Sequence, residues 1–195
     1  REESESEVLS LAGLREEEDM FSSVWKSAQN RWPWVALNLC TAFIASRVIG
    51  AFEGTIAQIV ALATLMPIVS GIGGNTGTQT STLIIRAIAL GQITSGTTRR
   101  LMLKESGIAL LNGVVWGSVL GVVAWMLYKK WTIGLLMMAA MTLNLQVAAL
   151  VGILVPISMH KLGRDPAFGS SVLLTFSTDS MGFFIFLGLA TLFLL

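Results

Sequence analysis

Residues 167–195 read AFGSSVLLTFSTDSMGFFIFLGLATLFLL, an apolar stretch in which Asp179 is the only charged residue. A helix needs about 20 mostly apolar residues to span the hydrocarbon core of a membrane, and this stretch is long enough. A carboxylate in the middle of such a span costs at least about 2.5 to 3.5 kcal/mol, so it needs a compensating partner. Because lysines and arginines at matching depth are scarce, we expect Asp179 to bind a cation or a proton. A protonated aspartate satisfied by a neighbouring helix is the structural alternative.

The composition of the whole chain is that of a membrane protein. Of its 195 residues, 53% are hydrophobic and only 13% are charged, whereas about a quarter of the residues in soluble domains are charged. Five segments are long and apolar enough to span a bilayer, which predicts an all-α integral membrane protein with five transmembrane helices. These segments run approximately over residues 33–52, 57–90, 105–128, 131–159 and 167–195.

Lysines and arginines predict the orientation of the chain, because short cytoplasmic loops carry them in excess. The basic residues on the richer side are Lys26, Arg31, Arg86, Arg99, Arg100, Lys104, Lys161 and Arg164. The other side carries only Arg47, Lys129 and Lys130. We therefore expect a multi-pass protein of the cell membrane with a cytoplasmic amino terminus and an external carboxyl terminus.

A polar, glycine-rich passage, MPIVSGIGGNTGTQTS at 66–81, interrupts the second predicted span. Pro67 and the glycines weaken a continuous helix, so we expect a break there. Irregular backbone at membrane depth is tolerated only where it is buried in protein or lines a water-filled cavity. Its carbonyls, with the amides of Asn75 and Gln79, would offer neutral oxygens to a hard cation or its hydration water. Close packing of helices through these small residues is a second, compatible interpretation.

Gly113, Gly117 and Gly121 repeat every four residues in the third span and predict a smooth strip for helix packing, within the chain or between subunits. Glu105 precedes this strip beside Lys104, and we interpret it as a structural charge that favours the start of the helix. Four intramembrane amides are expected to hydrogen-bond between helices: Asn38, Asn112, Asn144 and Gln146.

The sequence excludes some kinds of chemistry and disfavours others. The glycine-rich passage lacks the Gly-Lys-Ser/Thr of a phosphate-binding loop. One histidine, His160, and one cysteine, Cys40, cannot make a zinc site by themselves. An intramembrane enzyme acting on lipid head groups is a less favoured alternative, because it would need several clustered acids and only Asp179 lies deep inside a span. We expect no catalytic residues and no nucleic-acid partner.

The passage from Pro67 to Gln79, continuing into LIIRA at 83–87, resembles the signature of the MgtE family of magnesium channels. Its Gly-Gly-Asn-Thr-Gly-x-Gln element is specific. The other matching elements are Lys104-Glu105, Asp165-Pro-Ala167 before the last span, and Asp179 followed by Gly182. They occur in the expected order along the chain.

This resemblance implies a homodimer with five helices per subunit around a pore for Mg²⁺, in which Asp179 is the central selectivity residue. It further implies that Gly71 and Asn75 lie near the hydrated ion, and that Ala167 and Ser171 belong to the lining of the last helix. The family often has Asn-Pro where this chain has Ser171-Val172. The implied activity is passive Mg²⁺ transport, and a proton-coupled divalent-cation transporter is the alternative.

Residues 1–30 are predicted to form an amphipathic helix with an acidic face that leads into the pore domain at 31–195. Members of the family usually carry a soluble amino-terminal domain and paired CBS domains, joined to the membrane part by a helix that closes the pore when intracellular Mg²⁺ is high. Residues 1–30 resemble that helix, and the regulatory domains are absent from this chain. The acids that the resemblance implies as regulatory cation ligands are Glu5, Glu7, Glu16, Glu17, Glu18 and Asp19.

Overall fold

The computed structural model describes residues 21–195, apart from the side chains of Ser95 and Phe168. The helices are α2 (Val24–Gly50), α3 (Glu53–Gln58), α4 (Ala61–Ala89), α5 (Ser95–Tyr128), α6 (Trp131–Lys161) and α7 (Ala167–Leu194). The predicted all-α fold is confirmed for the described residues. Most of the predicted connecting helix lies outside them, together with the six acids that are implied as cation ligands, and residues 24–30 are part of α2.

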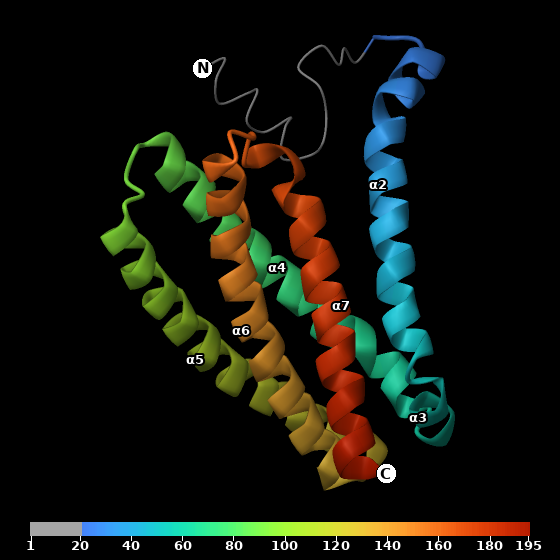
Figure 1. The fold of residues 1–195 in the computed structure, drawn as a ribbon. Coiled ribbons are helices and arrows are strands. Elements are labelled where there is room, and N and C mark those ends of the chain that lie inside the picture. Colours follow the sequence, from blue (N-terminus) through green and yellow to red (C-terminus); the bar gives the residue numbers. More distant parts are fainter. Residues whose placement is uncertain (1–20) are drawn as a thin grey trace.

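The long helices run alternately between two ends of the molecule, with α2 on one flank and α4 crossing obliquely behind α6 and α7 (Figure 1). Within residues 21–195, four helices are long and apolar enough to cross a membrane: α2, α5, α6 and α7. α4 is not among these four, and its glycine-rich passage interrupts its apolar residues. A membrane crossing by α4 therefore belongs to the proposal made below.

The predicted break inside the glycine-rich passage is wrong. The chain breaks earlier, at Ile59 and Val60 between α3 and α4, and α4 then continues through Pro67 and the glycines. Close packing holds this weak helix together. A Cβ added at Gly73 would lie 2.3 Å from Nδ2 of Asn144 on α6, and one at Gly77 would lie 2.8 Å from Cδ1 of Leu174 on α7. Tertiary packing thus outweighs the low helix propensity of the passage.

The third span begins earlier than predicted, because α5 starts at Ser95. Thr94 caps this helix, since its side chain accepts a hydrogen bond from the backbone N–H of Thr97. Glu105 therefore lies well inside α5, and its interpretation as a charge at the helix start is wrong.

The glycine strip of α5 lies against α6 in the same chain. A Cβ added at Gly113 would come within 2.7 Å of the Cα of Thr142, and one at Gly117 within 3.0 Å of the carbonyl oxygen of Met138. Gly121 faces Gly134, where an added Cβ would lie 2.6 Å from the carbonyl oxygen. The backbones of α5 and α6 are therefore in direct contact.

The core is centred on α6, which packs against α4, α5 and α7, whereas α2 packs mainly on α7. Two of the predicted cross-helix amide bonds are confirmed: Asn144 Nδ2 donates to the carbonyl of Val69 on α4, and Gln146 Nε2 to that of Ser106 on α5. Asn38 instead donates to Trp34 O in its own helix, contrary to the prediction.

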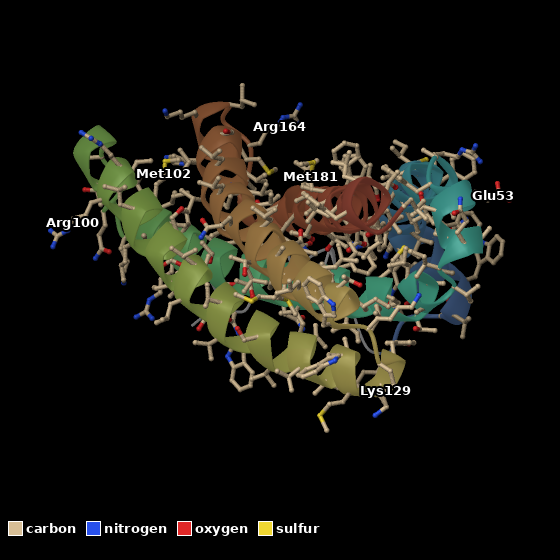
Figure 2. The ribbon with its side chains drawn as sticks, turned by 90° about the horizontal axis from the view of Figure 1, so that it is seen from below. Glu53, Arg100, Met102, Lys129, Arg164 and Met181 are labelled. Atoms are coloured by element: carbon tan, nitrogen blue, oxygen red, sulfur yellow. The ribbon has the colours of Figure 1, made fainter. Side chains whose placement is uncertain are left out.

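Charged side chains lie mostly at the periphery. Glu53, Arg100, Lys129 and Arg164 point away from the bundle (Figure 2). Among the acids of residues 21–195, Glu53 and Asp165 are exposed, Asp179 is half-buried and Glu105 is buried. The functional chemistry of the described helices is therefore expected at the last two.

The contact of α5 with α6 predicts the effect of substitutions in the glycine strip. Gly121→Ala should destabilise the protein by about 1 to 3 kcal/mol, because its methyl group would collide with a backbone carbonyl. Gly107→Ala in the same helix is the control, since nothing lies within 4 Å of its added Cβ. The free energy of unfolding in detergent micelles measures both. Equal stability of the two variants would contradict this packing.

Candidate ion-binding site

Asp179 lies on α7 where this helix meets α4. Its Oδ1 accepts a hydrogen bond from the hydroxyl of Ser70 on α4. No lysine or arginine among the described residues pairs with this carboxylate. In addition, residues 21–195 contain no group of three His, Cys, Asp or Glu side chains that could hold a metal ion. One chain therefore supplies one carboxylate and a hydroxyl partner.

The hydroxyls beside Asp179 along α7 have different environments. Thr178 is fully buried, and its Oγ1 donates to Leu174 O within the helix at 3.0 Å. Thr175 is exposed and lies one turn before Asp179 on the same face of α7. Of these two hydroxyls, only that of Thr175 is therefore exposed on the face that carries the acid.

Asn144 of α6 lies near Asp179 and brings a third helix to this region. The sequence alone did not distinguish Asn144 from the other intramembrane amides. Asn144 is fully buried on α6, and its Nδ2 donates at 2.9 Å to the carbonyl of Val69, the residue before Ser70. Its side chain fits between Gly73 of α4 and Gly182 of α7, where added Cβ atoms would lie 2.3 and 2.9 Å from Nδ2. Asn144 therefore fixes the spacing of α4 and α7 at the acid.

Two polar atoms near Asp179 lack partners. Among the buried side chains that the structure describes, Asn144 Oδ1 and Ser180 Oγ form no hydrogen bond. An unpaired buried polar atom costs about 1 to 3 kcal/mol. Such atoms are rare and often mark functional positions, so their presence on both sides of Asp179 supports a functional role for this region.

Gly71 and Asn75 lie on the exposed side of α4. Gly71 follows Ser70 and is open, with nothing within 4 Å of an added Cβ. Asn75 lies about 140° around the helix from Ser70, given 3.6 residues per turn. It lines a cavity of about 550 Å³ between α4 and α5, together with Gln79 and Asn112. Within one chain, Gly71 is therefore near the acid and Asn75 faces a different space.

Ala167 and Ser171 lie toward the start of α7. The backbone N–H of Ala167 donates to Oδ1 of Asp165 at 2.8 Å, which ties down the first turn. Ala167 is buried and Ser171 is half-buried. At 1.5 Å per residue, Ala167 lies about 18 Å from Asp179 along the helix axis. These residues therefore cannot bind the same ion as Asp179 and could only serve another part of a path.

Glu105 is a second acid between helices, and its environment was missed from sequence. It is only 8% exposed, and its Oε2 accepts a hydrogen bond of 3.0 Å from Thr80 Oγ1. Two acids in the described helices are not exposed, and each accepts a hydrogen bond from a hydroxyl of α4. Ser70 donates to Asp179, and Thr80 donates to Glu105.

Comparison with known proteins identifies related chains. A family model named MgtE, described as a divalent cation transporter, matches residues 66–189. The magnesium transporter MgtE of Bacillus subtilis (strain 168) is 32% identical over 173 residues, which cover 89% of this chain and 38% of that protein. The magnesium transporter MgtE of Thermus thermophilus is 37% identical over 164 residues, which cover 83% of this chain and 36% of that protein.

A third relative, the magnesium transporter MgtE of Enterococcus faecalis, is 28% identical over 193 residues, or 99% of this chain. The matches span between 36% and 42% of the length of these relatives. The similarity therefore concerns the helical region described above, and covers less than half of each relative.

The position of Asn144 predicts that it stabilises the region around Asp179. Asn144→Ala should lower the free energy of unfolding by about 1 to 3 kcal/mol, because the Val69 carbonyl loses a buried donor and a gap opens between two glycines. Asn38→Ala is the control, since that amide bonds only within α2. Denaturation in detergent micelles compares the variants, and a loss no larger than that of the control would contradict the role of Asn144.

Proposed function

Because this chain belongs to the MgtE family of divalent cation transporters, we propose that it forms the membrane part of a Mg²⁺ transporter whose ion passes Asp179. The proposal is carried by one observation: a half-buried carboxylate inside an apolar helix, whose partner among residues 21–195 is a hydroxyl and not a basic side chain. Membership of a transporter family rules out the interpretation as an enzyme acting on lipid head groups.

The chemistry around Asp179 suits a hydrated ion better than a dry one. Mg²⁺ requires octahedral oxygen ligands and loses its water reluctantly, so it usually keeps several waters and binds through one or two carboxylates. Asp179 provides the charge, and the exposed hydroxyl of Thr175 and the open backbone at Gly71 leave room beside it. Weak contacts through water also allow the ion to leave, which conduction requires.

A second copy of the chain completes this site in our proposal. One carboxylate per chain balances half the charge of a divalent ion, and two balance it fully. The middle of α4 exposes several polar or small residues, which is unusual for a surface that faces lipid. They are Gly71, Asn75, Thr78, Gln79 and Thr82. Polar groups within membranes face the interior of a bundle or a water-filled cavity. We therefore infer that α4 crosses the membrane as a fifth span and lines a pore in a homodimer.

The distribution of basic residues supports the orientation of this pore. The end of α4, the start of α5, the end of α6 and the start of α7 lie at one end of the molecule (Figure 1). That end carries the larger set of basic residues, including Arg99, Arg100 and Lys161. Because short cytoplasmic loops carry an excess of basic residues, we infer that this end of the molecule faces the cytoplasm. The half-buried Ser171 would then line the cytoplasmic half of the path, whereas Ala167 is buried within the chain.

Regulation by intracellular Mg²⁺ is part of the proposal. The acids implied as ligands, Glu5, Glu7 and the run from Glu16 to Asp19, precede the described residues. In our proposal, these acids bind Mg²⁺ when its intracellular concentration is high and so close the pore from the cytoplasmic side.

Replacing the acid tests the proposed function. In proteoliposomes, Asp179→Asn should reduce Mg²⁺ uptake by about tenfold or more, because a loss of about 1.4 kcal/mol of stabilisation of the ion already gives tenfold. A dye that reports Mg²⁺ inside the vesicles measures the flux. Glu53→Gln is the matched control, since Glu53 is exposed in α3 and contributes nothing to the site. Full uptake by Asp179→Asn, with unchanged selectivity for Mg²⁺ over Ca²⁺, would contradict the proposal.

A further inference from the structure

Two grooves lie side by side at the start of α6. One runs between α6 and α7 and has a volume of about 290 Å³. The other runs between α5 and α6 and has a volume of about 240 Å³. Trp131 and Leu135 line both grooves, and because they are four residues apart they lie on one face of α6. These two side chains, which are 64% and 55% exposed, therefore form a ridge between the grooves.

Apolar side chains and glycines make up most of the walls. The groove between α6 and α7 is further lined by Thr132, Leu136, Ala139, Leu189, Phe193 and Leu194. The groove between α5 and α6 is further lined by Ser118, Gly121, Val122, Trp125, Gly134 and Met138. The hydroxyl of Ser118 is satisfied within its own helix, because it donates to the carbonyl of Val114 at 2.6 Å. Walls of this kind favour hydrocarbon over a polar solute or an ion.

The two grooves begin at the same level and reach a similar depth. Both start at Trp131, the first residue of α6, and they extend along this helix to Ala139 and Met138. At 1.5 Å per residue, this is about 10 to 12 Å along the helix axis. One leaflet contributes half of a hydrocarbon core that is about 30 Å thick, so both grooves fit within a single leaflet. Two hydrocarbon chains that start at one level are what a diacyl phospholipid offers.

Two lysines lie where the head group of such a lipid would be. Lys129 and Lys130 immediately precede Trp131 and are exposed, and Lys129 points away from the bundle (Figure 2). The other charged residues at this end of the described helices are Arg47 in the last turn of α2 and Glu53 at the start of α3. Glu53 lies well apart from Lys129 (Figure 2). The charge beside the grooves is therefore positive, which favours an anionic head group.

We propose that the start of α6 binds one anionic diacyl phospholipid. Its phosphate contacts Lys129 and Lys130, one acyl chain occupies the groove between α6 and α7, and the other occupies the groove between α5 and α6. Trp131 lies between the chains at the level of the head groups, where tryptophan is enriched in membrane proteins. Asp179 is about 15 Å from Leu189 along the axis of α7. The lipid site is thus separate from the proposed ion path and does not depend on Mg²⁺ transport.

Photochemical crosslinking in detergent micelles tests this site. The probe is phosphatidylglycerol with a diazirine in each acyl chain, and mass spectrometry of the digested protein locates the crosslinks. They should fall on residues 131–139 and 189–194 for one groove and on residues 118–125 for the other. Phosphatidylcholine with the same chains should label these residues much less. In the double variant Lys129→Gln, Lys130→Gln, labelling by phosphatidylglycerol should fall about tenfold, because each basic residue beside an anionic lipid adds severalfold to the affinity.

The double variant Arg99→Gln, Arg100→Gln is the matched control, since it removes two adjacent exposed basic residues at the other end of α5. It should leave the labelling of both grooves unchanged. Equal labelling by the two lipids, or full labelling after loss of the lysines, would overturn the proposal. Absence of crosslinks from the grooves would also overturn it, and is the result expected if a second copy of the chain covers them. Circular dichroism shows that each variant keeps its helices.

Discussion

Asp179 meets Ser70 because α4 lies very close to α6 and α7. The side chain of Asn144 on α6 contacts both α4 and α7 there. Gly73 and Gly182 leave a space that the side chain of Asn144 fills, and Gly77 lies directly against Leu174. In a membrane there is little hydrophobic drive for helices to associate, so tight packing through small residues and a few hydrogen bonds must hold them together. The glycine-rich passage therefore remains helical and allows α4 to pack closely against α7 beside Asp179.

This arrangement gives α4 polar contacts with α5, α6 and α7. Ser70 reaches α7, the Val69 carbonyl reaches α6, and Thr80 reaches α5. Its opposite, exposed side carries the amides of Asn75 and Gln79. A helix with polar groups on several sides is poorly suited to face lipid. Both acids that are not exposed among the described residues, Asp179 and Glu105, therefore contact α4.

The membrane class could be predicted from sequence, because apolar length is a local signal. The isolated acid Asp179 could be singled out for the same reason, and its role in transport stays a prediction. The strip at Gly113, Gly117 and Gly121 was predicted from its spacing alone. The partners of the acids could not be predicted, since Ser70 and Thr80 meet them across 109 and 25 residues of chain. The glycine content predicted a break in α4, but packing against side chains of α6 and α7 keeps its backbone helical. Likewise, α5 begins after the cap at Thr94, so Glu105 lies in the interior of the helix and not at its start.

The central claim is that Mg²⁺ itself passes along the helix face that carries Asp179. Single-channel recording of the purified protein in a planar bilayer, with Mg²⁺ as the only permeant cation, tests it most directly. The account predicts unitary currents whose reversal potential follows the Mg²⁺ gradient. Currents whose reversal potential ignores that gradient, or Mg²⁺ flux into vesicles without any unitary current, would contradict passive conduction of Mg²⁺ through this pore.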